Sequence, residues 1–118
     1  MNFEQYTVSL LYRRADAPQL SEAEAAALQD AHMANLSDLY DAGHLLASGP
    51  VTGPPESGLC GFAILKADPA RARQLKEDDP AVRAGVYRIE VYPWLLPAGL
   101  VHFLRGRLPR SMAEITSD

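Results

Sequence analysis

The middle of the chain reads GHLLASGP at residues 43–50 and GFAILK at residues 61–66. Each run contains a short apolar segment of strand length. The residues 52–58 between them (TGPPESG) are rich in glycine and proline, which favour turns. The pattern predicts a β-hairpin at the centre of the chain, with strands over residues 44–48 and 61–66.

A long helix is predicted before this hairpin. Ser21 and Glu24 have the spacing of a capping box, in which the serine hydroxyl and the glutamate carboxylate each bind the other residue's amide. No proline or glycine interrupts residues 21–42, and Gly43 then suits the left-handed end of a helix. We therefore expect one helix over residues 21–42.

A second helix is predicted after the hairpin. Asp68 can cap a helix that begins at Pro69, because proline is well tolerated in the first helical turn. The ring of Pro80 disfavours the helical conformation at Asp79 and should end this helix. Residues 81–85 are then expected to form a short turn.

Alternating apolar and polar residues predict one strand near each end of this pattern. Residues 6–13 (YTVSLLYR) and residues 86–94 (VYRIEVYPW) both alternate with a period of two. The order βαββαβ predicts an α+β, ferredoxin-like fold, an antiparallel sheet with two helices on one face. We expect one domain over residues 1–94 and an extension over residues 95–118.

Six residues are assigned by alternation to the face of the sheet that the helices leave uncovered: Thr7, Ser9, Leu11, Arg88, Glu90 and Tyr92. This set is too polar for a core and too apolar for a fully solvated face. We therefore expect two copies to pack face to face around a semi-polar cleft, as a homodimer or higher homo-oligomer.

The composition argues against several classes of partner. The 118 residues include 15 acidic and 11 basic side chains, a formal net charge of −4, which gives no electrostatic reason to bind nucleic acid. Every apolar run is shorter than the ~20 residues that cross a bilayer, and the first residues do not resemble a signal peptide. A single cysteine, Cys60, cannot form an internal disulfide. We expect a cytoplasmic protein without a membrane partner.

Neither a metal nor a cofactor is predicted. His44 and His102 lack metal-ligand spacing with any cysteine or acidic cluster. Cys60 has no histidine or basic neighbour in the sequence that would activate it, so we expect a packed thiol there.

Four motifs occur in order along the chain: AHMANL at 31–36, GHLLASGP at 43–50, DPAVRAG at 79–85 and VYPW at 91–94. Together they resemble the YCII-related (YciI-like) family over about residues 5–94. The resemblance implies a dimeric α+β barrel and a histidine–aspartate pair proposed as an acid/base site in its cleft. Carried over to this sequence, that pair is His32 and Asp79. Enzymatic members of the family act in the degradation of chlorinated aromatics.

The chain departs from this family pattern in two places. Members often carry an arginine a few residues before the helix histidine, where Gln29 and Asp30 stand here, so this chain lacks the arginine from which the resemblance implies anion binding. The chain also continues beyond Trp94, and we expect residues 95–118 to form an arm that packs on a neighbouring subunit. Residues 111–118 are expected to be frayed.

Imidazole can accept and donate a proton at neutral pH, and a carboxylate on its other nitrogen fixes the tautomer. His32 and Asp79 are therefore the candidate catalytic residues. The plainer alternative is a buried histidine with a satisfied hydrogen bond and an aspartate that caps the turn before Pro80. Ser48, Arg88 and Tyr92 are candidate substrate-binding residues. Ser48 can instead bond the local backbone, and Arg88 can instead pair across the dimer.

The sequence thus predicts a cofactor-free enzyme that acts on a small aromatic or enolisable molecule by proton transfer or elimination, with His32 as general acid/base and Asp79 orienting it. Two alternatives stay open. One is a ligand-binding or accessory module that uses the same dimer cleft without chemistry. The other is an assembly protein that recruits a partner through residues 95–118.

Overall fold

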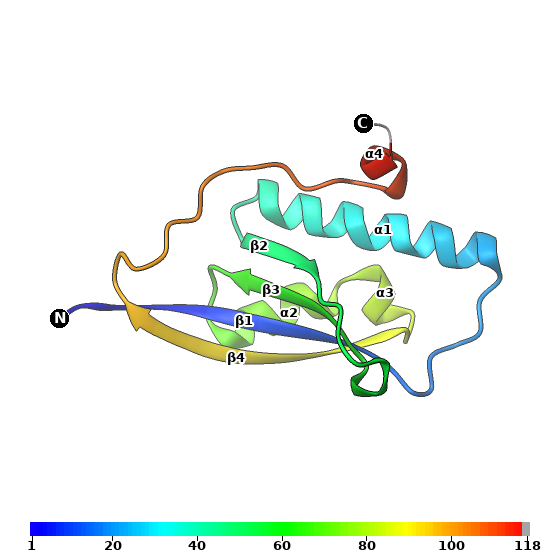
Figure 1. Cartoon of the computed structure of the whole chain (residues 1–118), viewed down its shortest axis with the longest axis horizontal. Helices are drawn as coiled ribbons and strands as arrows, with labels where there is room; N and C mark the ends of the chain where they lie inside the picture. Colours follow the sequence, from blue (N-terminus) through cyan, green and yellow to red (C-terminus); the bar gives the residue numbers. More distant parts are fainter. Residues whose placement is uncertain (117–118) are drawn as a thin grey trace.

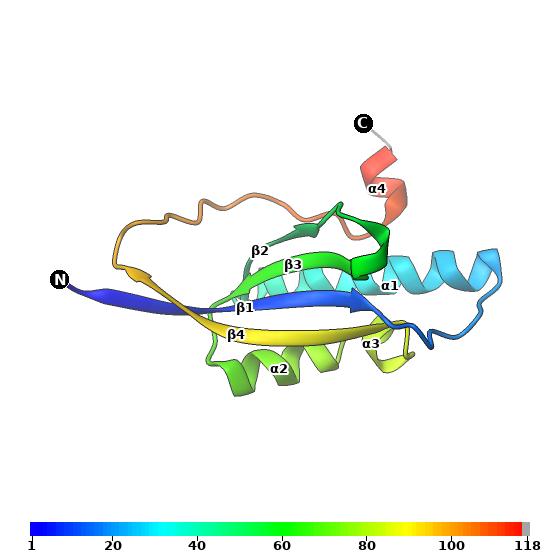
Figure 2. The same ribbon diagram turned by 60° about the horizontal axis from the view of Figure 1, so that its bottom comes forward.

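A computed structural model describes residues 1–116 and arranges four strands in one antiparallel sheet (Figure 1). The strands are β1 (Phe3–Arg13), β2 (Leu45–Pro50), β3 (Leu59–Leu65) and β4 (Tyr87–Pro97), in the spatial order β2-β3-β1-β4. Helices α1 (Glu22–Asp41), α2 (Pro69–Glu77) and α3 (Pro80–Arg83) cover one face (Figure 2). A short 3-10 helix, η1 (Pro55–Ser57), lies in the hairpin loop. The predicted ferredoxin-like α+β fold is confirmed.

Helix α1 begins and ends close to the predicted residues because local signals fix both ends. The Ser21 hydroxyl accepts a hydrogen bond from the Glu24 amide at 3.1 Å, and the Glu24 carboxylate accepts one from the Ser21 amide at 3.0 Å. Gly43 follows the helix with φ +85°, a conformation that favours glycine. The side chains buried along α1 are His32, Met33, Ser37 and Tyr40.

The first and last strands of the chain are longer than predicted. Strands β1 and β4 stay paired from Arg13 opposite Tyr87 to Phe3 opposite Pro97. Pro93 lies within β4 without breaking it. Proline has no amide hydrogen to donate, and β4 is an edge strand whose outer side pairs with no other strand of the sheet. The predicted turn over residues 81–85 is largely a single helical turn, α3, because Asp79 caps a new helix that has Pro80 in its first turn.

The facing of β1 was predicted wrongly. Thr7, Ser9 and Leu11 lie beneath the helices rather than on the open face, where they are 0%, 1% and 7% exposed. The Thr7 hydroxyl donates a hydrogen bond to the carbonyl of Ala67, next to α2, at 2.6 Å. The prediction failed because both faces of β1 are partly covered, so polarity alone does not identify the helix side.

The open face is consequently more apolar than expected. Arg88, Glu90 and Tyr92 do lie there, and their direct partners on β1 are Tyr12, Leu10 and Val8 respectively. Phe62 of β3 pairs with Leu10 on its other side and is 38% exposed. Aromatic and aliphatic side chains thus form much of this surface.

One cluster of buried apolar side chains fastens α1 and α2 to the sheet. Its members come from α1, β2, β3 and α2: Tyr40, Leu45, Ala63, Leu65, Ala72 and Leu75. Leu45 and Leu65 have no exposed surface. Leu108, from the extension after β4, packs against the edge of this cluster.

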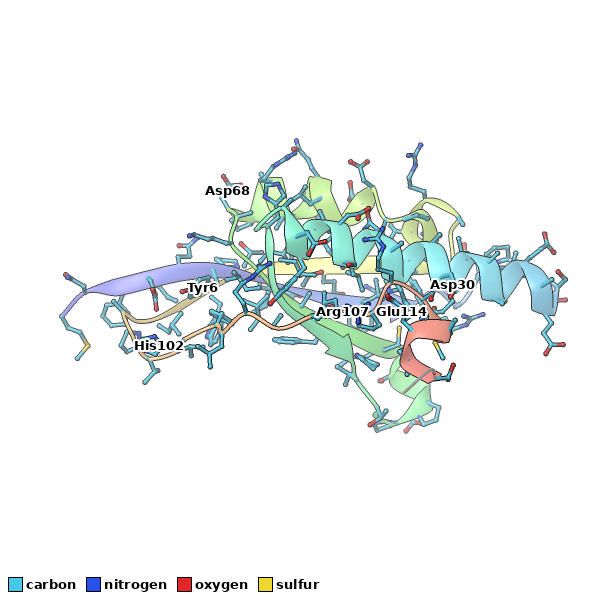
Figure 3. The ribbon with its side chains drawn as sticks, turned by 90° about the horizontal axis from the view of Figure 1, so that it is seen from above. Tyr6, Asp30, Asp68, His102, Arg107 and Glu114 are labelled. Atoms are coloured by element: carbon cyan, nitrogen blue, oxygen red, sulfur yellow. The ribbon has the colours of Figure 1, made fainter. Side chains whose placement is uncertain are left out.

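The extension returns across the molecule to α1 and ends in α4 (Met112–Thr116) (Figure 1). The Tyr40 hydroxyl accepts a hydrogen bond from the Gly106 amide at 2.7 Å, and Arg110 forms an ion pair with Asp38 at 2.8 Å. Figure 3 shows Asp30, Arg107 and Glu114 where α4 meets α1; Arg107 is ion-paired with Glu114. The described part of the predicted inter-subunit arm therefore lies on its own chain, and a further contact with a second copy stays a prediction.

The prediction of a frayed end was wrong for most of residues 111–118. Residues 112–116 form α4, and the Asp30 carboxylate of α1 accepts a hydrogen bond from the Met112 amide at 3.0 Å. The start of α4 is held on α1 by this contact between residues far apart in the sequence, which no local pattern reveals. Residues 117 and 118 lie outside the described residues.

Candidate active site

His32 and Asp79 meet in the interior of the molecule although they lie 47 positions apart in the sequence. His32 comes from the middle of α1, and Asp79 is the N-cap residue of α3. The His32 Nδ1 atom lies 2.6 Å from Asp79 Oδ2, and the two side chains are 9% and 0% exposed. Asp79 Oδ1 accepts a second hydrogen bond, from the Ala81 amide at 2.8 Å. Asp79 therefore caps α3 and holds His32 at the same time.

This geometry selects one tautomer of the imidazole. A carboxylate accepts hydrogen bonds and donates none, so Nδ1 carries the proton that points at Asp79. The other ring nitrogen, Nε2, is then free to accept a proton. The Tyr87 ring stands beside the imidazole, with ring centres 5.7 Å apart, and restricts its movement.

A pocket of about 440 Å³ opens beside this pair, and His32 forms part of its wall. The floor comes from the helix side of the sheet, including Ser9 and Leu11 of β1. Most of the other lining side chains are apolar, and the volume suits a small organic molecule. Four residues of the extension close one side: Leu108, Pro109, Met112 and Ile115.

The three predicted substrate-binding residues are divided between two sites. Ser48, at the end of β2, lines the pocket together with His32. Arg88 and Tyr92 lie on the opposite face of the sheet, where the Arg88 guanidinium stacks on the Tyr12 ring at 4.2 Å. Both donate hydrogen bonds to Glu90, at 2.7 and 2.9 Å. A single chain does not bring them to His32, and their contact with a ligand stays a prediction.

The sequence analysis missed Lys76 of α2. This lysine is 3% exposed and lines the pocket. Burial lowers the pKa of its ammonium group below the ordinary value, and the charge of Asp79 opposes that change. The signal that points to it is helical spacing: Lys76 follows the buried Ala72 by four residues and therefore lies on the same face of α2.

Burial also changes the pKa of two further residues that line the pocket, Cys60 and Tyr87. Burial raises the pKa of the Cys60 thiol, whose Sγ donates a hydrogen bond to the Leu11 carbonyl at 3.4 Å. Burial also raises the pKa of the Tyr87 phenol. Both groups are therefore neutral at physiological pH. Within residues 1–116, no three His, Cys, Asp or Glu side chains are grouped as metal ligands would be.

Replacing Lys76 with methionine is expected to raise the free energy of unfolding at neutral pH, with a gain that shrinks as the pH rises. Between the lowered pKa of the folded chain and the ordinary value of 10.5, the unfolded chain binds the additional proton. The free energy of unfolding of the parent therefore increases with pH in this window, while methionine has no proton to lose. Urea unfolding of both proteins at neutral pH and at about pH 9.5 measures the difference. A variant less stable than its parent at neutral pH would contradict this expectation.

The fold and the pocket together define a ferredoxin-like α+β protein with a buried histidine–carboxylate pair beside a cavity of small-molecule size. The chain belongs to the YCII-related domain family, whose model matches residues 7–95. The resemblance seen in the sequence is thereby confirmed. The match ends before most of the extension that closes the pocket.

A solved structure with a similar fold is 5-chloro-2-hydroxyhydroquinone dehydrochlorinase (TftG) from Burkholderia phenoliruptrix AC1100, in complex with 2,5-dihydroxybenzoquinone. The TM-score is 0.51 and the sequence identity is 23%. The alignment covers 75% of this chain and 92% of that one. At this identity the likeness concerns the fold. A search among curated proteins gave no match. No helix within residues 1–116 has the length and apolar character needed to cross a membrane.

Proposed function

We propose that this protein is a cofactor-independent enzyme in which His32 acts as general acid/base and Asp79 orients it. The observation that carries the proposal is the buried contact of 2.6 Å between Nδ1 and Oδ2, made by a histidine that also lines a pocket. A fixed tautomer with a free Nε2 is what proton transfer to and from a bound molecule requires. Ser48 lines the same pocket and is proposed to contact the substrate.

The proposed substrate is a small aromatic or enolisable molecule. The C–H bond next to a carbonyl group breaks, the proton moves to Nε2, and the electron pair shifts to the carbonyl oxygen to give an enolate. His32 is then an imidazolium, which Asp79 stabilises through Nδ1. The proton returns to another atom of the substrate in an isomerisation, or a leaving group departs in an elimination. The similar fold of a dehydrochlorinase, solved with a hydroxyquinone bound, supports this class of molecule.

Deuterium exchange tests this proposal. 2,5-Dihydroxybenzoquinone is incubated with the protein in heavy water, and exchange of its ring hydrogens is followed by proton NMR. We expect the parent to accelerate exchange and the variant His32→Gln to lose that acceleration. His102→Gln, at an exposed histidine of the extension, is the matched control and should behave as the parent. Saturable binding of the quinone without any exchange would reject catalysis and favour a binding module.

We also propose that the protein is a cytoplasmic homodimer whose copies meet through the open face of the sheet. The aliphatic and aromatic residues there, Leu10 and Phe62 among them, support this assembly. Arg88 and Tyr92 would then lie at the interface, within reach of the second copy.

The variant Leu10→Glu is expected to be monomeric, because it places a carboxylate opposite Glu90 in the middle of this face. Sedimentation velocity of the parent and the variant measures the change. Lys66→Glu, at an exposed position beyond the end of β3, is the control and should leave the assembly intact. A parent that sediments as a monomer would rule out the proposed dimer.

A further inference from the structure

Lys76 is a buried charged side chain without a direct partner. It is 3% exposed, and within residues 1–116 no carboxylate lies at ion-pair distance from its ammonium group and no hydrogen bond satisfies it. Asp79, the nearest influence on its charge, already accepts hydrogen bonds with both oxygens, from His32 and from the Ala81 amide. Withdrawing a lysine side chain from most of its water without supplying a partner costs free energy. Lys76 lies in the wall of the pocket, where a bound molecule can reach its ammonium group.

The other residues of the pocket wall determine which kind of ligand the ammonium group of Lys76 can attract. Of the residues that line the pocket, only Lys76 and His32 have basic side chains, and none is an aspartate or a glutamate. Ser9 adds a second unsatisfied group: it is 1% exposed, lines the same pocket, and its Oγ has no hydrogen-bond partner within the described residues. The largely apolar wall therefore contains one lysine and one buried hydroxyl group that has no hydrogen-bond partner within the described residues.

We propose that Lys76 binds an anionic oxygen of the ligand, with the Ser9 hydroxyl as a second donor, so that the pocket selects small apolar molecules carrying a phenolate, enolate or carboxylate oxygen. An oxyanion supplies the missing partner of the ammonium group, and the attraction is stronger than in bulk water because most of the side chains that line the pocket are apolar. The inference deepens the proposed function, on which it rests for the choice of pocket. In that reaction Lys76 would hold the oxygen that becomes negative when His32 removes a proton.

The proposal is tested with a pair of probes of nearly the same shape. 4-Nitrophenol ionises to a phenolate in weakly alkaline buffer, and 4-nitroanisole has no ionisable group. Absorbance titration gives the affinity of each probe for the parent, for Lys76→Met and for Lys66→Met, the last a control at an exposed lysine. Thermal unfolding of each variant shows whether it is folded.

The parent is expected to bind the phenolate more tightly than the anisole. Lys76→Met should lose about 10- to 100-fold in phenolate affinity, as for a hydrogen bond to a charged group. It should keep its affinity for the anisole and unfold at a temperature no lower than that of the parent. Lys66→Met should match the parent. Equal losses for both probes would mean that Lys76 only shapes the pocket, and a parent that binds neither probe or both equally would also overturn the proposal.

The deuterium-exchange assay separates this proposal from the catalytic one. If phenolate affinity depends on Lys76 but the parent does not exchange ring hydrogens, the anion site stands and the chemistry fails. If the parent exchanges but Lys76→Met keeps full phenolate affinity, the chemistry stands and the anion site fails.

Discussion

The variant Asp79→Asn is expected to slow proton transfer by about 10²- to 10⁴-fold while the chain remains folded. Asp79 accepts two hydrogen bonds, one on each carboxylate oxygen, whereas the asparagine amide has a single accepting oxygen. If that oxygen stays with the Ala81 amide, the NH₂ group faces His32 Nδ1 and forces the proton onto Nε2. The nitrogen that must accept the substrate proton is then already occupied. The rate of deuterium exchange into 2,5-dihydroxybenzoquinone measures the loss.

Nitrogen-15 NMR of the imidazole distinguishes the wrong tautomer from a loss of structure. The expected result is a shift of the proton from Nδ1 to Nε2 in Asp79→Asn. The adjacent variant Asp78→Asn is the control, because Asp78 is exposed and ends α2 without touching His32. A slowed Asp79→Asn that keeps the parent tautomer would show that Asp79 acts in some way other than orientation. An unslowed variant would remove Asp79 from the mechanism.

The variant Leu65→Ala is expected to lower the free energy of unfolding by about 3 kcal/mol. Leu65 has no exposed surface and lies in the cluster that joins α1 and α2 to the sheet, where the truncation leaves a cavity. Because α1 carries His32, weaker anchoring of that helix should also loosen the pair with Asp79. Urea unfolding of the parent and the variant measures the stability change.

Leu95→Ala is the matched control for this variant. Leu95 is also a strand leucine, but it is 61% exposed, so its truncation should change the free energy of unfolding by less than about 0.5 kcal/mol. Similar losses in the two variants would mean that the cluster around Leu65 does not dominate the stability of the fold.

Local signals made most of the fold predictable. The capping box at Ser21 and Glu24, the stop at Gly43 and the glycine- and proline-rich loop of the hairpin each act within a few residues, and each lies where it was expected. The facing of β1 depends instead on which surface the helices cover. Residues on both sides of that strand are apolar enough to be covered, so Thr7 and Ser9 were placed on the wrong face.

The site was predictable only in part, for the same reason. His32 and Asp79 were singled out by a set of motifs in a fixed order, and the structure brings them within hydrogen-bonding distance. Lys76 belongs to no motif, and its burial arises from the packing of α2 against the sheet. The course of the extension rests on contacts such as that between Arg110 and Asp38, 72 residues apart, which leave no periodic trace in the sequence.

The extension that closes the pocket has an evolutionary consequence. The residues of the candidate acid/base pair lie inside the span shared with the family, whereas Leu108, Pro109, Met112 and Ile115 lie beyond it. A lineage can therefore remodel the tail of the chain, and with it one wall of the pocket, without changing the residues of the candidate acid/base pair. Grafting this tail onto a relative that lacks it would therefore change the shape of the pocket while the candidate pair stays the same.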